Sequence, residues 1–121
     1  MNILLIEGNA AVRDALVMLL EDMGHTVHCV SSVDTGLAYL HNTTSSHVVI
    51  VSNQTPFNRS LTSFFQRVND DPTLRDAHRY VALTTAPGTL PPQTHAALQS
   101  LHAALIYKPF DLEDLLATLA V

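Results

Sequence analysis

The sequence predicts an α/β protein in which helices cover both faces of a five-stranded parallel sheet, a doubly wound arrangement. Three observations lead to this fold class. Short apolar runs alternate with amphipathic segments along the whole chain, and 121 residues suffice for one domain with one core. In addition, residues 48–51 read Val-Val-Ile-Val, a run typical of a central strand buried on both faces.

The strands and helices are expected in strict alternation. Short apolar runs predict strands at residues 2–6, 27–30, 48–51, 80–83 and 104–107. Apolar residues at helical spacing predict five helices, over 12–23, 33–40, 61–68, 97–101 and 112–119. Local signals fix several ends: Asn9 and Ser31 or Ser32 can cap helices, Gly24 can close the first, and Pro72 ends the third. Pro91-Pro92 can open the fourth helix.

Composition excludes several classes of protein. Apolar residues make up 47% of the chain and charged residues 14%, whereas disordered chains show the opposite balance. No apolar run reaches the ~18 residues of a membrane-spanning helix, and no secretory signal precedes the first strand. We therefore expect a cytoplasmic protein with no membrane partner. The single Cys29 cannot form an intramolecular disulfide, and its apolar strand predicts a buried thiol.

The charge distribution argues against direct nucleic-acid binding. The formal net charge is −5, and Lys108 is the only lysine. The arginines are scattered along the chain, whereas binding to nucleic acid draws on a clustered basic face. They are Arg13, Arg59, Arg67, Arg75 and Arg79. A surface this short of charge favours contact with other proteins.

Polar residues follow the expected strands where an α/β sheet forms its sites, at the carboxyl ends. Residues 3–9 read Ile-Leu-Leu-Ile-Glu-Gly-Asn, and residues 48–56 read Val-Val-Ile-Val-Ser-Asn-Gln-Thr-Pro. Residues 83–85 read Leu-Thr-Thr, and residues 108–110 read Lys-Pro-Phe before a leucine-rich helix. With these segments the chain resembles, over essentially its whole length, the receiver domain of two-component response regulators. The resemblance implies one receiver-like domain over 1–121, with a flavodoxin-like fold and strand order 2-1-3-4-5.

The resemblance also implies phosphotransfer, which the residues themselves dispute. A receiver uses an acceptor aspartate and two further acids that hold Mg²⁺. Ser52, four residues before a proline, occupies the acceptor position, and a hydroxyl is a poor nucleophile without an activating base. Of the acidic pair, Glu7 is present and Gly8 replaces the other. We therefore predict a degenerate pseudo-receiver that is not an enzyme, has no catalytic residues or cofactor, and binds Mg²⁺ weakly through Glu7 or not at all.

Three further positions can be matched to the receiver pattern. Thr84 matches the hydroxyl that contacts the phosphoryl group, and Lys108 matches the lysine that pairs with it. The aromatic switch position, three residues before that lysine, is Leu105, which cannot repeat the switch of an aromatic ring. We expect Lys108, lacking its acceptor carboxylate, to pair with Glu7 and to hydrogen-bond Ser52 or Thr84, because an unpaired buried lysine is costly.

Function is then expected to come from a surface. The leading interpretation is an atypical signalling module that binds another signalling protein or dimerises, without phosphorylation. The alternatives are a phosphoryl-accepting switch that uses Glu7 or a nearby residue, and a flavodoxin-like ligand-binding domain. In receivers the usual output face lies on the last two helices and the last strand. Here its expected outward residues are Gln99, His102, Ala103, Asp114, Ala117 and Thr118.

The histidines and the neighbouring pair of phenylalanines are expected to have no functional role. The seven histidines are expected to be scattered over the surface, without forming a metal site. The pair Phe64-Phe65 is expected to be core packing. We expect no output domain within the given sequence. It can be a whole protein or a domain of a longer one, and Met1 at its start favours a native N-terminus.

Overall fold

The computed structural model describes residues 1–52, 59–84, 92–107 and 112–120. In this part of the chain, five parallel strands form one sheet in the order β2-β1-β3-β4-β5, as expected. The strands are β1 (Asn2–Ile6), β2 (Thr26–Val30), β3 (Val48–Ser52), β4 (Arg79–Thr84) and β5 (Ala104–Tyr107). The helices are α1 (Ala10–Asp22), α2 (Val33–Asn42), α3 (Arg59–Asp70), α4 (Pro72–Ala77), α5 (Pro92–Ser100) and α6 (Leu112–Ala120).

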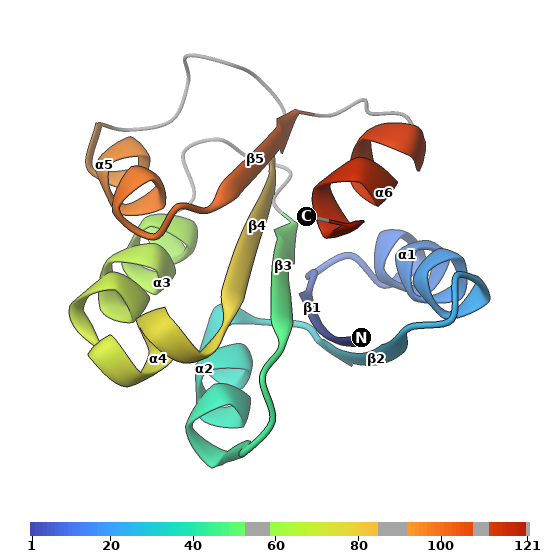
Figure 1. Cartoon of the computed structure of the whole chain (residues 1–121), viewed down its shortest axis with the longest axis horizontal. Helices are drawn as coiled ribbons and strands as arrows, with labels where there is room; N and C mark the ends of the chain where they lie inside the picture. Colours follow the sequence, from blue (N-terminus) through green and yellow to red (C-terminus); the bar gives the residue numbers. More distant parts are fainter. Residues whose placement is uncertain (53–58, 85–91, 108–111, 121) are drawn as a thin grey trace.

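The helices cover both faces of the sheet. Helices α2, α3, α4 and α5 lie on one face, and α1 and α6 lie on the other (Figure 1). Within the described ranges, none of these helices is long and apolar enough to cross a membrane. The doubly wound arrangement places the carboxyl ends of all five strands at one edge, where the site is expected.

The local signals in the sequence act as predicted at the helix ends. The side chain of Asn9 accepts a hydrogen bond from the backbone N–H of Val12 at 3.0 Å, and Ser32 Oγ accepts one from Thr35 at 3.2 Å. Gly24 closes α1 with a φ of +90°, which a glycine adopts without steric cost. Each satisfies backbone groups that the first or last turn of a helix leaves without partners. Pro91 lies outside the described residues.

One short helix was not expected. Pro72 ends α3, as predicted, but it also stands at the first position of α4. Asp71 caps this helix by accepting hydrogen bonds from Thr73 at 3.0 Å and Leu74 at 3.3 Å. Proline suits that position because its missing N–H would have no partner there anyway. The described chain therefore has six helices where the sequence predicted five.

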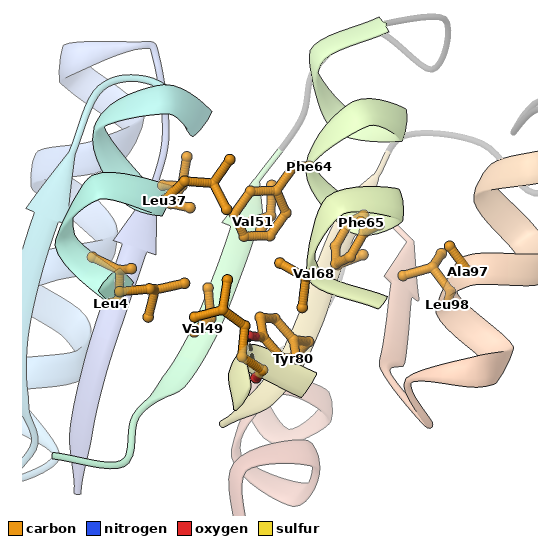
Figure 2. Close-up of a cluster of buried hydrophobic side chains, with 14 of the residues drawn as sticks. Leu4, Leu37, Val49, Val51, Phe64, Phe65, Val68, Tyr80, Ala97 and Leu98 are labelled. Atoms are coloured by element: carbon orange, nitrogen blue, oxygen red, sulfur yellow. Dashed lines mark hydrogen bonds between the residues drawn. The ribbon is translucent and has the colours of Figure 1, made fainter. Parts of the chain in front are cut away.

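Alternate residues of the strands supply the two hydrophobic cores. Leu4 and Ile6 face the core beneath α2, α3 and α5, while Ile3 and Leu5 face the core beneath α1 and α6. In the first core, α3 lies across β3 and β4 with its aromatic side chains pointing at the sheet (Figure 2). Phe64 and Phe65 are fully buried there, which confirms that the pair is core packing.

The expectation that Cys29 is buried is wrong. Cys29 lies on β2, and its side chain is exposed. β2 stands at the edge of the sheet, and only Val30 of this strand is buried. An apolar run was therefore not enough to predict that Cys29 is buried.

The expectation of scattered surface histidines is also wrong in one region. His47, just before β3, is buried. The ring of His28 stacks on Tyr39 with centroids 4.2 Å apart, and the Tyr39 hydroxyl lies 3.0 Å from His47 Nε2. The backbone N–H of His47 in turn donates to His78 Nδ1 at 3.0 Å. The three histidines and Tyr39 thus form one connected array at the amino-terminal edge of the sheet. Among the described residues, no group of three or more His, Cys, Asp or Glu side chains could hold a metal ion.

This array makes folding stability depend on pH. Burial, and then the neighbouring His47, lower the pKa of His78 below its usual value of 6.5. The unfolded chain therefore takes up the proton more readily than the folded one. The contribution of neutral His78 to folding stability is thus complete above about pH 6.5, and it is lost as the pH falls from there through the pKa of the folded state. We expect the urea midpoint of unfolding to fall as the buffer is taken from about pH 8 to about pH 5.

A conservative variant isolates the contribution of His78. His78→Asn keeps an oxygen that can accept the His47 N–H but cannot be protonated, so its urea midpoint should depend less on pH than that of the native chain. His41→Asn, on the exposed part of α2, is the matched control and should keep the native dependence. Equal slopes for the native chain and His78→Asn would contradict the assignment.

Candidate functional site

Three predicted site residues meet at the carboxyl edge of the sheet. Glu7 follows β1, whose last residue pairs with the residue before Ser52. Thr84 ends β4. It comes one residue after Leu83, which pairs with Ser52 of β3. All three side chains are buried, with exposed fractions of 1%, 8% and 0% for Glu7, Ser52 and Thr84. The fold therefore brings these positions onto three neighbouring strands, in the arrangement that the sequence predicted.

Glu7 is held by the backbone around the turn from β1 to α1. Its N–H donates to the carbonyl of Val30 at 3.1 Å, and its Oε1 accepts from the N–H of Asn9 at 3.4 Å. Arg13 Nη1 donates to the Glu7 carbonyl at 3.2 Å, so this arginine closes the turn. Sequence reasoning counted Arg13 only among scattered charges. Its position one turn into the helix after Glu7 was the signal that could have found it.

Two buried oxygen atoms at this edge lack hydrogen-bond partners within the described part of the chain. They are Glu7 Oε2 and Thr84 Oγ1. An unsatisfied buried polar group costs roughly 1–3 kcal/mol of stability. Such groups are uncommon in folded proteins and call for an explanation in each case.

A pair of buried threonines tests this cost. Thr84 and Thr94 are both fully buried, but Thr94 shares a hydrogen bond of 2.6 Å with the Thr62 hydroxyl. Valine has nearly the same shape as threonine and no hydroxyl. We expect Thr84→Val to raise the free energy of unfolding by about 1 kcal/mol and Thr94→Val to lower it by about 1 kcal/mol, measured by urea denaturation. A Thr84→Val variant less stable than the native chain would show that this hydroxyl does have a hydrogen-bond partner.

The described residues at this edge of the sheet offer one carboxylate to a metal ion. Among the described residues that follow or end β1, β3 and β4, Glu7 supplies the only carboxylate, because Gly8 and Ser52 stand at the other two positions. Mg²⁺ is usually bound through one or two protein carboxylates in near-octahedral geometry, with waters and substrate oxygens completing the shell. The carboxylate of Glu7 already accepts a hydrogen bond from the Asn9 N–H through Oε1. Weak or absent Mg²⁺ binding stays a prediction.

Packing does not force the glycine at position 8. A Cβ added to Gly8 would have one neighbour within 4 Å, the Ser31 carbonyl oxygen at 3.5 Å, which is an ordinary contact. Gly8 is exposed. A side chain can therefore be introduced there without moving the backbone.

The predicted pair between Lys108 and Glu7, with its hydrogen bond to Ser52 or Thr84, stays a prediction. Lys108 lies outside the described residues. Leu105, at the expected switch position, is half-buried and packs against the core beneath α3 and α5. Its contacts are those of a core residue.

The expected interaction face is partly as predicted. Gln99, His102, Asp114 and Ala117 are exposed, and Thr118 is half-buried with its hydroxyl donating to the Asp114 carbonyl at 2.9 Å. The expectation that Ala103 points outward is wrong, because this residue packs against the core beneath α3 and α5. The turn that ends α5 draws Ala103 inward through a hydrogen bond from its N–H to the Leu98 carbonyl at 2.9 Å.

The structure of the chain matches those of response regulator receiver domains. A CheY-like receiver domain protein from Methanospirillum hungatei is 26% identical, with a TM-score of 0.75 over 96% of this chain and 88% of that chain. Chemotaxis response regulator CheY4 of Vibrio cholerae is 22% identical, with a TM-score of 0.75 over 98% and 95%. A CheY-like receiver domain from Methylobacillus flagellatus is 19% identical, with a TM-score of 0.77 over 99% and 96%. The sequence matches no protein-family model and no curated protein.

Proposed function

We propose that this chain is a receiver-like signalling domain that works without phosphorylation, through contact with another protein or with a second copy of itself. One observation carries the proposal: β3 ends in Ser52 at the position where a receiver has its acceptor aspartate. A serine hydroxyl needs a base to become a nucleophile. Neither the acyl-phosphate cycle nor an enzymatic role follows from such a site.

The surroundings of Ser52 support the same conclusion. Gly8 removes a second Mg²⁺ ligand, and Leu105 replaces the aromatic ring of the switch. These departures fall on three separate parts of one mechanism, so together they point to loss of the mechanism rather than to change at one position. Glu7 is a poor alternative acceptor because its carboxylate is 1% exposed and faces no solvent from which a phosphodonor could approach.

The remaining way to signal is through the surface. The exposed residues Gln99, His102 and Ala117 carry no fixed charge, which suits a protein contact. Direct contact with nucleic acid is disfavoured by the net charge of −5 and the scattered arginines. The proposed setting is the cytoplasm, where two-component signalling takes place.

The first test is intact mass after incubation with acetyl phosphate and Mg²⁺. We expect no added phosphoryl mass on the native chain, and the same sedimentation behaviour with and without the phosphodonor. A stoichiometric, hydroxylamine-labile adduct on the native chain would overturn the proposal. Such an adduct would identify a carboxylate as acceptor and make the chain a working switch.

A further inference from the structure

A pocket of about 570 Å³ opens at the edge of the sheet opposite to Glu7, Ser52 and Thr84. It lies between the amino-terminal ends of β4 and β5 and the carboxyl-terminal ends of α5 and α6. Its size falls within the roughly 300–1,000 Å³ typical of small-molecule sites. Because the strands are parallel, this pocket is separate from the receiver-like edge, the carboxyl edge of the sheet where Glu7, Ser52 and Thr84 lie. Two residues of its lining, His102 and Ala117, also belong to the contact surface proposed above, so a ligand here would lie beside that surface.

The apolar part of the pocket comes from the two strands and the end of α5. Leu101 and Ala104 are half-buried apolar residues of the lining, while the lining residues Tyr80 and Val81 of β4 are almost fully buried. Burying apolar ligand surface against such groups is favourable by roughly 25 cal/mol per Å². The pocket can therefore hold the apolar body of a small molecule.

The polar side chains of the lining are mostly hydrogen-bond donors. Arg79 is held in place by a hydrogen bond from Nη2 to the Leu119 carbonyl at 3.1 Å, and none of the described acids forms an ion pair with it. Its guanidinium has five N–H groups, so several remain for a ligand. His78 Nδ1 already accepts the His47 N–H, which leaves the proton of the neutral ring on Nε2 as a further donor. No residue lining the pocket is acidic.

His102 occupies an unusual backbone conformation beside this pocket. Its φ of 53° is the only positive value for a non-glycine residue among those described. Glycine is the usual residue at such a helix end, because it adopts this conformation without steric cost. The turn itself satisfies the last carbonyls of α5: Leu101, His102 and Ala103 donate their N–H groups to Ala97, Gln99 and Leu98. The imidazole is therefore not needed to end the helix.

We propose that this pocket binds a small organic anion, a carboxylate with an apolar body, through Arg79 and His102. The guanidinium and the imidazole donate to the carboxylate, and the body packs on the accessible apolar residues of the lining, Leu101, Ala104 and Ala117. A role in ending α5 does not explain His102, because glycine would fit this backbone conformation better.

The test uses octanoate and 1-octanol, which share an apolar chain and differ in the head group. Each is titrated into the isotopically labelled native chain and followed by two-dimensional proton–nitrogen NMR. Saturable shifts with octanoate are expected for the amides of Val81, Leu101 and Ala104. Octanol should bind at least about tenfold more weakly, because it lacks the charge that strengthens hydrogen bonds from Arg79 and His102. Equal affinity for the two probes, shifts on another face, or no saturable shifts would overturn the proposal.

Variants separate ligand recognition from helix capping. Arg79→Gln should raise the dissociation constant of octanoate about tenfold. Arg67→Gln, which removes the same charge from exposed α3, should leave it unchanged. His102→Gly should weaken octanoate binding several-fold while raising the melting temperature, since glycine relieves the backbone conformation. Unchanged binding in both Arg79→Gln and His102→Gly would overturn the proposal. It would show that Arg79 only caps the end of α6 and that His102 only ends α5.

Discussion

The double variant Gly8→Asp/Ser52→Asp is expected to accept a phosphoryl group from acetyl phosphate in the presence of Mg²⁺, where the native chain accepts none. Ser52→Asp supplies the nucleophile at the end of β3, and Gly8→Asp supplies a second acid beside Glu7. The backbone already brings these positions to one edge, and a Cβ at Gly8 meets only the Ser31 carbonyl, at 3.5 Å. We therefore expect these two side chains to be enough to supply the phosphotransfer that we propose the native chain lacks.

The single variants measure the part played by each acid. Gly8→Asp alone lacks an acceptor and should not label. Ser52→Asp alone has an acceptor but one acid fewer for the metal, so its initial labelling rate should be at least about tenfold below that of the double variant; a tenfold change corresponds to about 1.4 kcal/mol. Equal rates for the single and double variants would show that the acid at position 8 is dispensable.

Thermal stability gives an independent readout of the rebuilt site. Three neighbouring carboxylates repel one another, so the double variant should melt below the native chain when Mg²⁺ is absent. Metal that binds only the folded state raises stability by mass action, so Mg²⁺ should raise the melting temperature of the double variant and not of the native chain. A folded double variant that neither labels nor responds to Mg²⁺ would mean that more of the site than two acids is lost.

The strand and helix positions could be predicted because their signals are local. The run at residues 48–51 is buried as a central strand, and the caps at Asn9 and Ser32 begin their helices. Such signals depend on spacing within one turn or one strand, which a sequence displays directly. The short helix at Pro72–Ala77 was missed because the same proline both ends one helix and begins the next.

Features that depend on distant parts of the chain could not be predicted. The exposure of Cys29 follows from the place of β2 at the edge of the sheet, and the burial of His47 follows from contacts with Tyr39 and His78. Ala103 lies inward because it packs against the core beneath α3 and α5, which distant segments of the chain build. None of these is visible as a local pattern.

In the candidate site, too, the positions of the residues could be predicted but their hydrogen bonds could not. Its positions were predictable because the carboxyl ends of parallel strands share one edge, so Glu7, Ser52 and Thr84 were expected together. The hydrogen-bonding state of each side chain was not, because it depends on which groups the fold leaves within reach. Among the described residues, Glu7 Oε2 and Thr84 Oγ1 find no hydrogen-bond partner, which follows from the tertiary structure.

The second large effect is expected in the core that holds the receiver-like edge in place. Phe64→Ala should lower the free energy of unfolding by about 3–5 kcal/mol. Phe64 is fully buried and meets Phe65 edge-on with centroids 5.3 Å apart, and Tyr80 at 6.3 Å (Figure 2). Alanine would leave a cavity between α3 and the sheet that the rigid strands cannot fill.

Urea denaturation followed by circular dichroism measures this loss. Met18→Ala is the control, since Met18 is 66% exposed on α1 and its truncation should change stability by no more than about 0.5 kcal/mol. α3 is the helix that follows β3 in the chain, so its packing on the sheet helps to hold the strand that ends in Ser52. A loss below about 1 kcal/mol for Phe64→Ala would mean that α3 contributes little to this core, against the geometry of Phe64, Phe65 and Tyr80.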